Sequence, residues 1–316
     1  PLNTFLIETL TATLVEAWEA RRPAELGFAY GQLDGITTNR QQNNDQVIDP
    51  DVGVLRVQEK GTRNCIAILS NFTGHPVILD STNLKLSCEF PGVSSETVEN
   101  VLGGVAIFTQ GACGDITMKR NGPKFEEVTR LGRVVAGEII ATAEQITLGE
   151  DSTLRSFGAD ISLEARSIPT PEEAAAGQES AKATLDGAKA DDAPEYVIKD
   201  LQREVYASNT TAMVAQHAVE QPDLLIAATQ TRYQVVQIGP MVAVAIPGEL
   251  FVEYALEMKR RVAQDTGRPM ILVGYANDYI GYIITPRADK TGGYERAISR
   301  VAPSAGRALT EAAMTA

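Results

Sequence analysis

Residues 239–295 carry the strongest strand and helix signals of the chain, and their order points to an α/β fold. A short apolar run rich in β-branched residues, 241–246, has the character of a buried strand. After a Pro-Gly pair, apolar residues recur at helical spacing, and basic residues follow near the end of that predicted helix. The apolar positions are Leu250, Tyr254, Met258 and Val262. A second buried strand is predicted at 270–275.

Glu249 lies at the predicted turn between the first strand and the helix, where open α/β sheets bind their ligands. The segment after the second strand carries Tyr279, Tyr282 and Tyr294. A carboxylate and several phenols are therefore expected near the ends of neighbouring strands. A glutamate in the first turn of a helix also interacts favourably with the helix dipole, and tyrosines near strand ends are often rim residues. The spacing alone leaves both interpretations open.

The composition of the 316-residue chain limits the classes of function open to it. Its length suffices for one large α/β domain or two smaller ones. The net charge of −13 argues against nucleic acids and anionic membranes as partners, because both attract clustered Lys and Arg side chains. An amphiphilic substrate held in a pocket is compatible with this charge. No apolar run approaches the length of a transmembrane helix, and the first residues, typical of the interior of a longer protein, carry no signal peptide.

Helix and strand signals alternate along the rest of the chain. Helices are expected at 1–22, from an N-cap at Ser94 or Ser95, at 125–147 and at 297–316. The first of them is expected to be amphipathic, with Phe5, Leu6, Leu10, Leu14 and Trp18 on one apolar face. Strands are expected at 25–34, 53–59, 65–71, 105–109, 152–163 and 224–236, with 105–109 buried. Between 169 and 222 the composition shifts to Ala, Glu, Lys and Asp, which indicates a helical insertion over one face of a single domain spanning 1–316.

Residues that commonly form cross-links or bind metal are few. Cys65, Cys88 and Cys113 are too scattered for a disulfide framework or a cysteine-type zinc site, and each is expected to be a small buried apolar residue. His75 follows strand 65–71 at its carboxyl end, a position that suits a ligand, although a lone histidine there is more often structural. His217 falls in the helical insertion and is expected on its solvent side.

Several short motifs, in this order along the chain, resemble the neutral/alkaline (non-lysosomal) ceramidases, a family of zinc-dependent amidases of lipid metabolism. The resemblance rests on PGE followed by a helix, on GYANDYIGYIITP and on GGYE, and it extends to the upstream segments NR, SCEFPG and GACGDIT. It covers nearly the whole chain, from the first helix to the last. It implies an α/β fold of layered mixed β-sheets flanked by helices, and Zn²⁺ as cofactor.

The resemblance also implies the ligands of that metal ion. Glu249 and Tyr282 match two zinc ligands of the family, and His75 matches its second zinc-binding histidine. Imidazole nitrogen and carboxylate oxygen are ordinary zinc ligands, and catalytic zinc sites keep one position open for water. A tyrosine titrates near ~10, so contact with the cation would favour its phenolate form. Water bound at such a site loses a proton near neutral pH and attacks an amide carbonyl.

Three further residues match family positions near the substrate. Tyr294 and Arg40 correspond to side chains beside the substrate carbonyl, where they would stabilise an oxyanion. Thr117 stands where ceramidases carry a catalytic serine. The additional methyl group of threonine crowds a substrate carbonyl, so this departure from the family pattern argues against ceramide itself as the substrate.

Two further departures keep other functions open. The first zinc histidine of the family, from an HTHS-type segment, has no counterpart in the sequence, and neither does the C-terminal β-sandwich of the larger ceramidases. The main hypothesis is a zinc-dependent hydrolase that cleaves an amide (N-acyl) or related bond in a small-molecule or lipid-like substrate. The alternatives are a catalytically inactive ligand-binding protein on the same fold, and a hydrolase with Thr117 as nucleophile and His75 as base. Neither the compartment nor the oligomeric state follows from the sequence.

Overall fold

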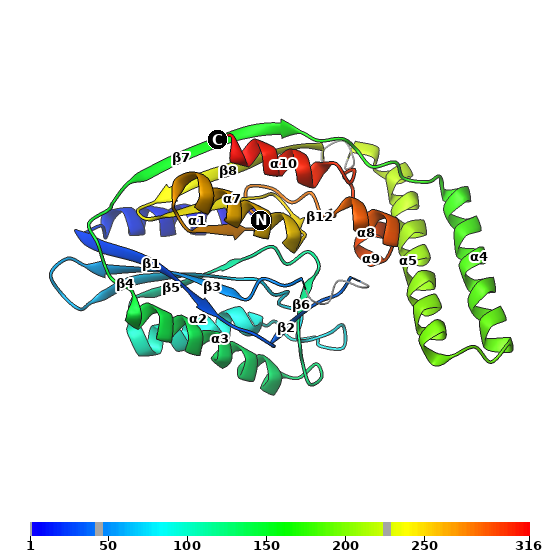
Figure 1. Ribbon diagram of the computed structural model, residues 1–316, viewed down its shortest axis with the longest axis horizontal. Helices are drawn as coiled ribbons and strands as arrows, with labels where there is room; N and C mark the ends of the chain where they lie inside the picture. Colours follow the sequence, from blue (N-terminus) through cyan, green and yellow to red (C-terminus); the bar gives the residue numbers. More distant parts are fainter. Residues whose placement is uncertain (1, 42–46, 224–228) are drawn as a thin grey trace.

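Two four-stranded sheets lie face to face at the centre of the computed structural model, which describes residues 2–41, 47–223 and 229–316 (Figure 1). The first sheet has the order β1-β3-β4-β5, with strands Ala24–Gln32, Asp51–Glu59, Cys65–Phe72 and Val105–Gln110. The second has the order β11-β9-β8-β7, with strands Met270–Val273, Met241–Ala245, Gln230–Ile238 and Leu154–Ser162. Buried Leu55 packs against Met241 and Ile271 between the sheets.

Helices cover the outer faces of both sheets. Helices α2 (Glu89–Leu102) and α3 (Phe125–Gln145) enclose one apolar core against the first sheet, and α7 (Val252–Thr266) and α10 (Ala305–Met314) enclose a second core against the other sheet (Figure 1). The pairs β4–β5 and β9–β11 are parallel, whereas the remaining pairs in both sheets are antiparallel. The predicted layers of mixed sheets flanked by helices are thereby confirmed.

Short elements gather at one end of the two sheets and later form the candidate site. Strand β2 (Thr37–Asn39) pairs antiparallel with β6 (Ile116–Met118), and β10 (Glu249–Leu250) pairs parallel with β12 (Tyr282–Ile283). Helices α8 (Pro286–Thr291) and α9 (Tyr294–Ile298) follow β12 directly. These segments are distant in sequence, so only the tertiary fold brings them together.

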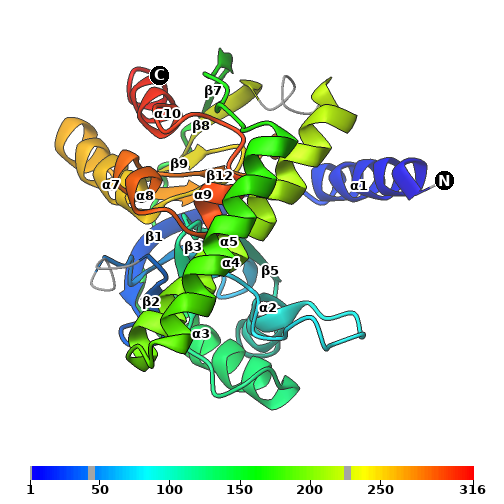
Figure 2. The same cartoon turned by 90° about the vertical axis from the view of Figure 1, so that its right-hand side faces the viewer.

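The segment predicted to be a helical insertion forms a long hairpin of α4 (Pro171–Ala190) and α5 (Glu195–Glu220). Thr170 begins α4 with a capping box, since its hydroxyl accepts from the Glu173 N–H while the Glu173 carboxylate accepts from the Thr170 N–H. The hairpin crosses one end of the sheets (Figure 2), instead of covering a face as expected, and α5 lies beside α9. This placement puts α5 next to the short elements described above.

Several predicted boundaries are wrong for identifiable reasons. Helix α2 begins at Glu89, so Ser94 lies inside it and is buried rather than capping it. Pro91 is tolerated there because the first turn of a helix needs no N–H donor. The closing helix is divided into α9 and α10, and Pro303 between them explains the interruption. The strand expected at 224–236 begins, as β8, at Gln230, and residues 224–228 of that prediction lie outside the described residues.

Some predicted burial is also wrong. Helix α1 (Leu2–Glu19) has no buried residue, and Trp18 is 68 % exposed, so its apolar face packs on nothing in the described part of the chain. Strand β5 is at the edge of its sheet, which exposes Val105 and Ile107. Cys88 is exposed, whereas Cys65 and Cys113 are buried as expected. No helix within the described residues has the length and apolar character needed to span a membrane.

The start of α3 provides a test of acid stability. Both oxygens of Glu127 accept from Arg130, and Oε1 also accepts from the Asn121 N–H at 3.0 Å. The Arg130 guanidinium lowers the pKa of Glu127 to about 2. A depressed carboxyl pKa gives stability that is present above ~4.5 and lost as the pH falls toward 2. We expect Glu127→Gln to cost at most about 1 kcal/mol at pH 7, since Arg130 is half exposed, and less at pH 3.

Urea unfolding at both pH values checks this expectation. Glu126→Gln is the matched control, because Glu126 is exposed in the same turn of α3. An equal loss of unfolding free energy for Glu127→Gln at pH 7 and pH 3 would contradict the assigned ion pair.

Candidate functional site

The imidazole of His75 and the carboxylate of Glu249 meet where the short elements gather. His75 Nε2 lies 2.8 Å from Glu249 Oε2. Glu249 is the first residue of β10, where its N–H donates to the Gly281 carbonyl and its partner across the ladder is Tyr282. His75 lies three residues after β4, and its N–H donates to the Ile116 carbonyl. Both side chains are buried, at 8 % and 5 % residue exposure.

The second ring nitrogen of His75 fixes the orientation of the imidazole. Nδ1 lies 2.7 Å from the carbonyl oxygen of Cys113, and a carbonyl can only accept, so Nδ1 carries a proton and donates. Nε2 is therefore the atom that faces Glu249. Histidines that bind metals commonly show this pattern, with one nitrogen donating to a carbonyl and the other directed at the ion.

In the absence of a cation, His75 and Glu249 form an ion pair. Burial alone lowers the pKa of His75, but the Cys113 side chain and the adjacent Glu249 outweigh it and raise this pKa to about 10. Burial would raise the pKa of Glu249, yet His75 and Tyr279 lower it overall. The 2.8 Å contact is nevertheless poorly aligned, and Glu249 Oε2 has no well-formed hydrogen bond among the described residues.

Tyrosines surround this pair. The Tyr279 hydroxyl donates to Glu249 Oε1 at 2.5 Å. The ring of Tyr282 stacks on His75 with centroids 6.4 Å apart, and its hydroxyl interacts with the Glu249 carboxylate. Burial and the nearby Glu249 charge raise the pKa of Tyr282, so without a cation this phenol is neutral. The Tyr275 hydroxyl lies 3.4 Å from Cys113 Sγ, and Tyr275 has a left-handed backbone (φ 56°), a strained conformation often found at functional sites.

Arg40 and Tyr294 lie on the side of Tyr282 that faces α9. Arg40 Nε donates to Glu295 Oε1 at 2.9 Å, and Nη2 donates to the Gly114 carbonyl at 2.6 Å. Nη1 has no hydrogen-bond partner in the described part of the chain. The Tyr294 ring lies 6.0 Å from the Tyr282 ring, edge to face.

Backbone pairing places Thr117 beside His75. It pairs with Thr38 in the β2–β6 ladder and forms an isolated parallel bridge with His75. Its side chain is half-buried, and its hydroxyl forms no hydrogen bond among the described residues. Both ring nitrogens of His75 are occupied, by Cys113 and by Glu249, which leaves neither as a base for Thr117.

Asp115 holds these segments together, and sequence reasoning missed it. Its carboxylate is fully buried, with Oδ1 accepting from the Val252 N–H at 2.9 Å and Oδ2 accepting from Asn39 Nδ2 at 2.7 Å. Burial raises the pKa of this carboxyl to about 7 in spite of those bonds. Asp115 therefore ties the start of α7 to β2. The GD pair of GACGDIT was the only local signal for it, and Glu295, also buried and missed, was marked only as the last residue of GGYE.

The donor set fits a small divalent cation in part. Within the described residues, no three His, Cys, Asp or Glu side chains converge on one point. His75, Glu249 and Tyr282 instead offer one nitrogen and two kinds of oxygen. Nε2 and Oε2 face each other closely without a well-formed hydrogen bond, as two ligands of one ion would. His217 is exposed on α5 and is not part of this cluster.

The chain is similar in sequence to a neutral ceramidase. No protein-family model matches the chain. It is 23 % identical over 339 aligned positions to the neutral ceramidase of Mycobacterium tuberculosis, a match that covers 89 % of this chain and 52 % of that protein. The chain thus spans about half the length of this relative.

Solved structures of ceramidases superpose on most of the chain. The neutral ceramidase of Pseudomonas aeruginosa matches with a TM-score of 0.67 and 19 % identity, over 95 % of this chain and 53 % of that one. A ceramidase complexed with C2 matches with a TM-score of 0.66 and 18 % identity, over 94 % and 53 %. The predicted resemblance to the neutral ceramidases is therefore confirmed, and the chain has the fold of the matched half of those proteins.

Proposed function

We propose that the chain is a zinc-dependent hydrolase that cleaves an amide (N-acyl) or related bond in a small-molecule or lipid-like substrate. The observation that carries this proposal is the meeting of His75 Nε2 with Glu249 Oε2 at 2.8 Å, beside Tyr282. These three side chains come from separate segments of the chain. The similarity to proteins named as neutral ceramidases supports the same class of reaction.

His75, Glu249 and Tyr282 would hold the Zn²⁺. When bound, the ion would lower the pKa of a water molecule and polarise the substrate carbonyl. The bond from His75 Nδ1 to Cys113 keeps Nε2 directed at the ion. Tyr279 holds Glu249 Oε1, and Oε2, the oxygen that faces His75, would be the ligand atom. To hold the ion, His75 would have to give up its Nε2 proton while Nδ1 keeps its own.

Arg40 and Tyr294 would stabilise the charge that develops on the substrate oxygen. Arg40 Nε and Nη2 fix the guanidinium to Glu295 and Gly114, so the group needs no reordering during the reaction, and Nη1 has no hydrogen-bond partner among the described residues. One such donor typically contributes ~3 kcal/mol to a transition state. The Thr117 hydroxyl, which forms no hydrogen bond among the described residues, would donate a hydrogen bond to the reacting group, and its methyl would narrow the space around that group.

Zinc titration tests this function directly. We expect the metal-free chain to bind about one Zn²⁺ at the His75 cluster, and the loaded chain to release hexanoate from N-hexanoyl amides. A chelator should stop the release, and added zinc should restore it. His217→Ala is the control, because it removes the other histidine without touching the cluster. Zinc binding that disappears with His217→Ala would overturn the assignment.

A catalytically inactive binding protein is the second candidate, and one observation favours it. The ion pair between His75 and Glu249 forms without any cation, and it keeps His75 protonated at neutral pH. Such an ion pair can contact a bound ligand directly, without a metal ion. Binding of an N-hexanoyl amide with neither zinc uptake nor hexanoate release would support this candidate.

A further inference from the structure

A large groove between α5 and α9 opens beside the candidate site. It has a volume of about 1150 Å³. The ring of Tyr206, on α5, lies 5.8 Å from the ring of Tyr294, on α9, and Tyr294 in turn contacts Tyr282. Arg40 and Glu295 also line the groove. A substrate whose scissile bond lies near Tyr282 and Tyr294 would therefore extend into this space.

Most of the described residues that line the groove have charged or hydrogen-bonding side chains. Among its described lining residues there is no Leu, Ile, Val, Met, Phe or Trp, and there are four basic and four acidic side chains. One face of α5 supplies much of this wall, with Lys199, Gln202, Arg203 and Tyr206 at helical spacing. Because the lining carries charges of both signs, the groove does not select ligands by their net charge alone. These side chains can donate and accept hydrogen bonds, so the groove favours ligands with hydrogen-bonding groups.

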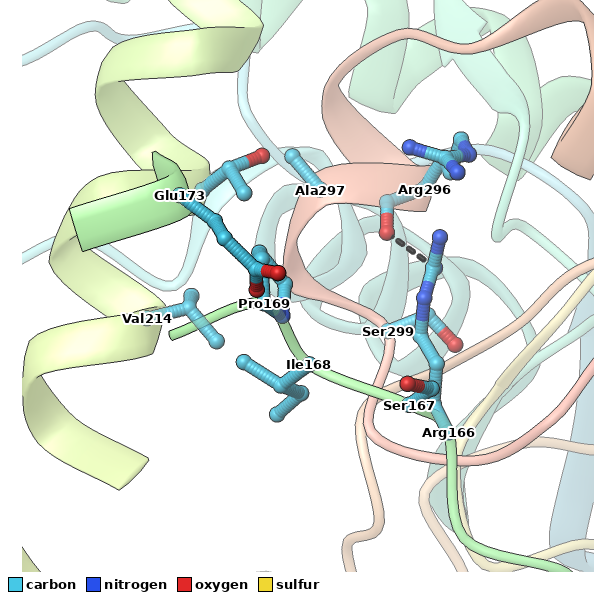
Figure 3. Close-up of a pocket in the computed structure, with 10 residues that line it drawn as sticks. Arg166, Ser167, Ile168, Pro169, Glu173, Val214, Arg296, Ala297 and Ser299 are labelled. Atoms are coloured by element: carbon cyan, nitrogen blue, oxygen red, sulfur yellow. Dashed lines mark hydrogen bonds between the residues drawn. The ribbon is translucent and has the colours of Figure 1, made fainter. Parts of the chain in front are cut away.

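Two large aliphatic side chains lie in a smaller pocket next to the groove (Figure 3). This pocket has a volume of about 330 Å³ and shares Pro169 and Glu173 with the groove. It contains Ile168 and Val214, but also Arg166, whose guanidinium donates to the Arg296 carbonyl and to Asp289. A hydrocarbon chain that ran from Tyr294 to this pocket would pass along the charged and amide side chains of the groove.

We propose that the part of the substrate lying between α5 and α9 is polar, such as a peptide or sugar, and is not a hydrocarbon chain. Hydrocarbon gains free energy only by leaving water for apolar surroundings, and no large aliphatic side chain, Phe or Trp is among the described residues that line the groove. It would also cover polar side chains without replacing their hydrogen bonds to water. This inference rests on the proposed function. It specifies the substrate as an amide with one polar part, which is either the amine or the acyl group.

Two amides of similar length separate the possibilities. N-hexanoyl-diglycine has one polar half, whereas N-hexyl hexanamide has hydrocarbon on both sides. With the zinc-loaded chain we expect kcat/KM for N-hexanoyl-diglycine to be at least about tenfold higher. Gln202→Leu should reduce that ratio by making the α5 wall more apolar. Gln216→Leu, an exposed position on the same helix outside the groove, should leave the ratio unchanged.

Binding measured by saturation-transfer NMR keeps this test independent of catalysis. If neither amide is hydrolysed, the proposed function fails, and tighter binding of N-hexanoyl-diglycine, weakened by Gln202→Leu, would still support the polar groove. Equal or tighter binding of N-hexyl hexanamide to the unmodified chain would overturn the inference. A ratio that Gln202→Leu and Gln216→Leu change alike would also overturn it, since the groove would then not be its source.

Discussion

Replacing Glu249 with Gln is expected to weaken zinc binding by more than about 100-fold and to abolish amide hydrolysis. Glu249 is the carboxylate of the cluster, and its Oε2 is the atom that faces His75 at 2.8 Å. Glutamine keeps the size of the side chain and an oxygen for the Tyr279 hydroxyl. The change therefore removes the negative charge while the fold is preserved. Metal content of the purified protein, zinc titration and hexanoate release measure the effect.

Glu253→Gln is the matched control for that experiment. Glu253 lies in the first turn of α7, four residues after Glu249, and its carboxylate pairs with Arg287 at 2.5 Å near the surface. Losing an ion pair of this kind changes stability by less than about 1 kcal/mol. Its zinc affinity and activity should match those of the unmodified chain. Undiminished zinc binding by Glu249→Gln would show that Glu249 is not a ligand, and the proposed function would fall with it.

Local patterns predicted the main elements well, because each depends on neighbours in sequence. The apolar run at 241–246 is β9, and the helical spacing up to Val262 is α7. Leu250 was assigned to that helix, but it belongs to β10, a two-residue strand whose partner is β12. No local pattern can indicate so short a strand, since its pairing depends on a segment more than thirty residues away. The apolar face of α1 was expected to be buried, but it is exposed. Burial depends on a second element that packs against the helix, and the sequence of the helix itself cannot indicate whether one is there.

The candidate site could be predicted only through the resemblance. Nothing in the spacing of His75, Glu249 and Tyr282 shows that they meet, and the family motifs supplied that expectation. The structure brings the three together, and it adds Tyr279 as a direct partner of Glu249. It also shows that Arg40 is held by Glu295, a contact across 255 positions of the chain. Contacts of this kind arise from the fold, so single-sequence reasoning could not find them.

Replacing Asp115 with Ala is expected to lower the free energy of unfolding by about 2–5 kcal/mol. The Val252 N–H and the Asn39 amide would both lose their acceptor in the interior, and each unpaired buried donor is costly. Because Asp115 fixes the start of α7, two residues beyond β10, zinc affinity should also fall, but less than for Glu249→Gln. Urea unfolding of the metal-free chain measures the first effect, and zinc titration measures the second.

The pH dependence of that loss identifies the carboxyl group as its source. The folded pKa of Asp115, about 7, lies above the ordinary value of ~3.9, so the folded state binds its proton more tightly than the unfolded state does. Its contribution to stability is therefore largest below ~4 and decreases as the pH rises to about 7. Asp115→Ala removes this decrease. The free energy of unfolding of the unmodified chain should therefore exceed that of the variant by more at pH 5 than at pH 8. Asp265→Ala, an exposed position on α7, should change stability by less than about 0.5 kcal/mol at either pH. A difference that grew with pH would mean that Asp115 is held as a carboxylate, and that its bonds to α7 and β2 outweigh the cost of burying its charge.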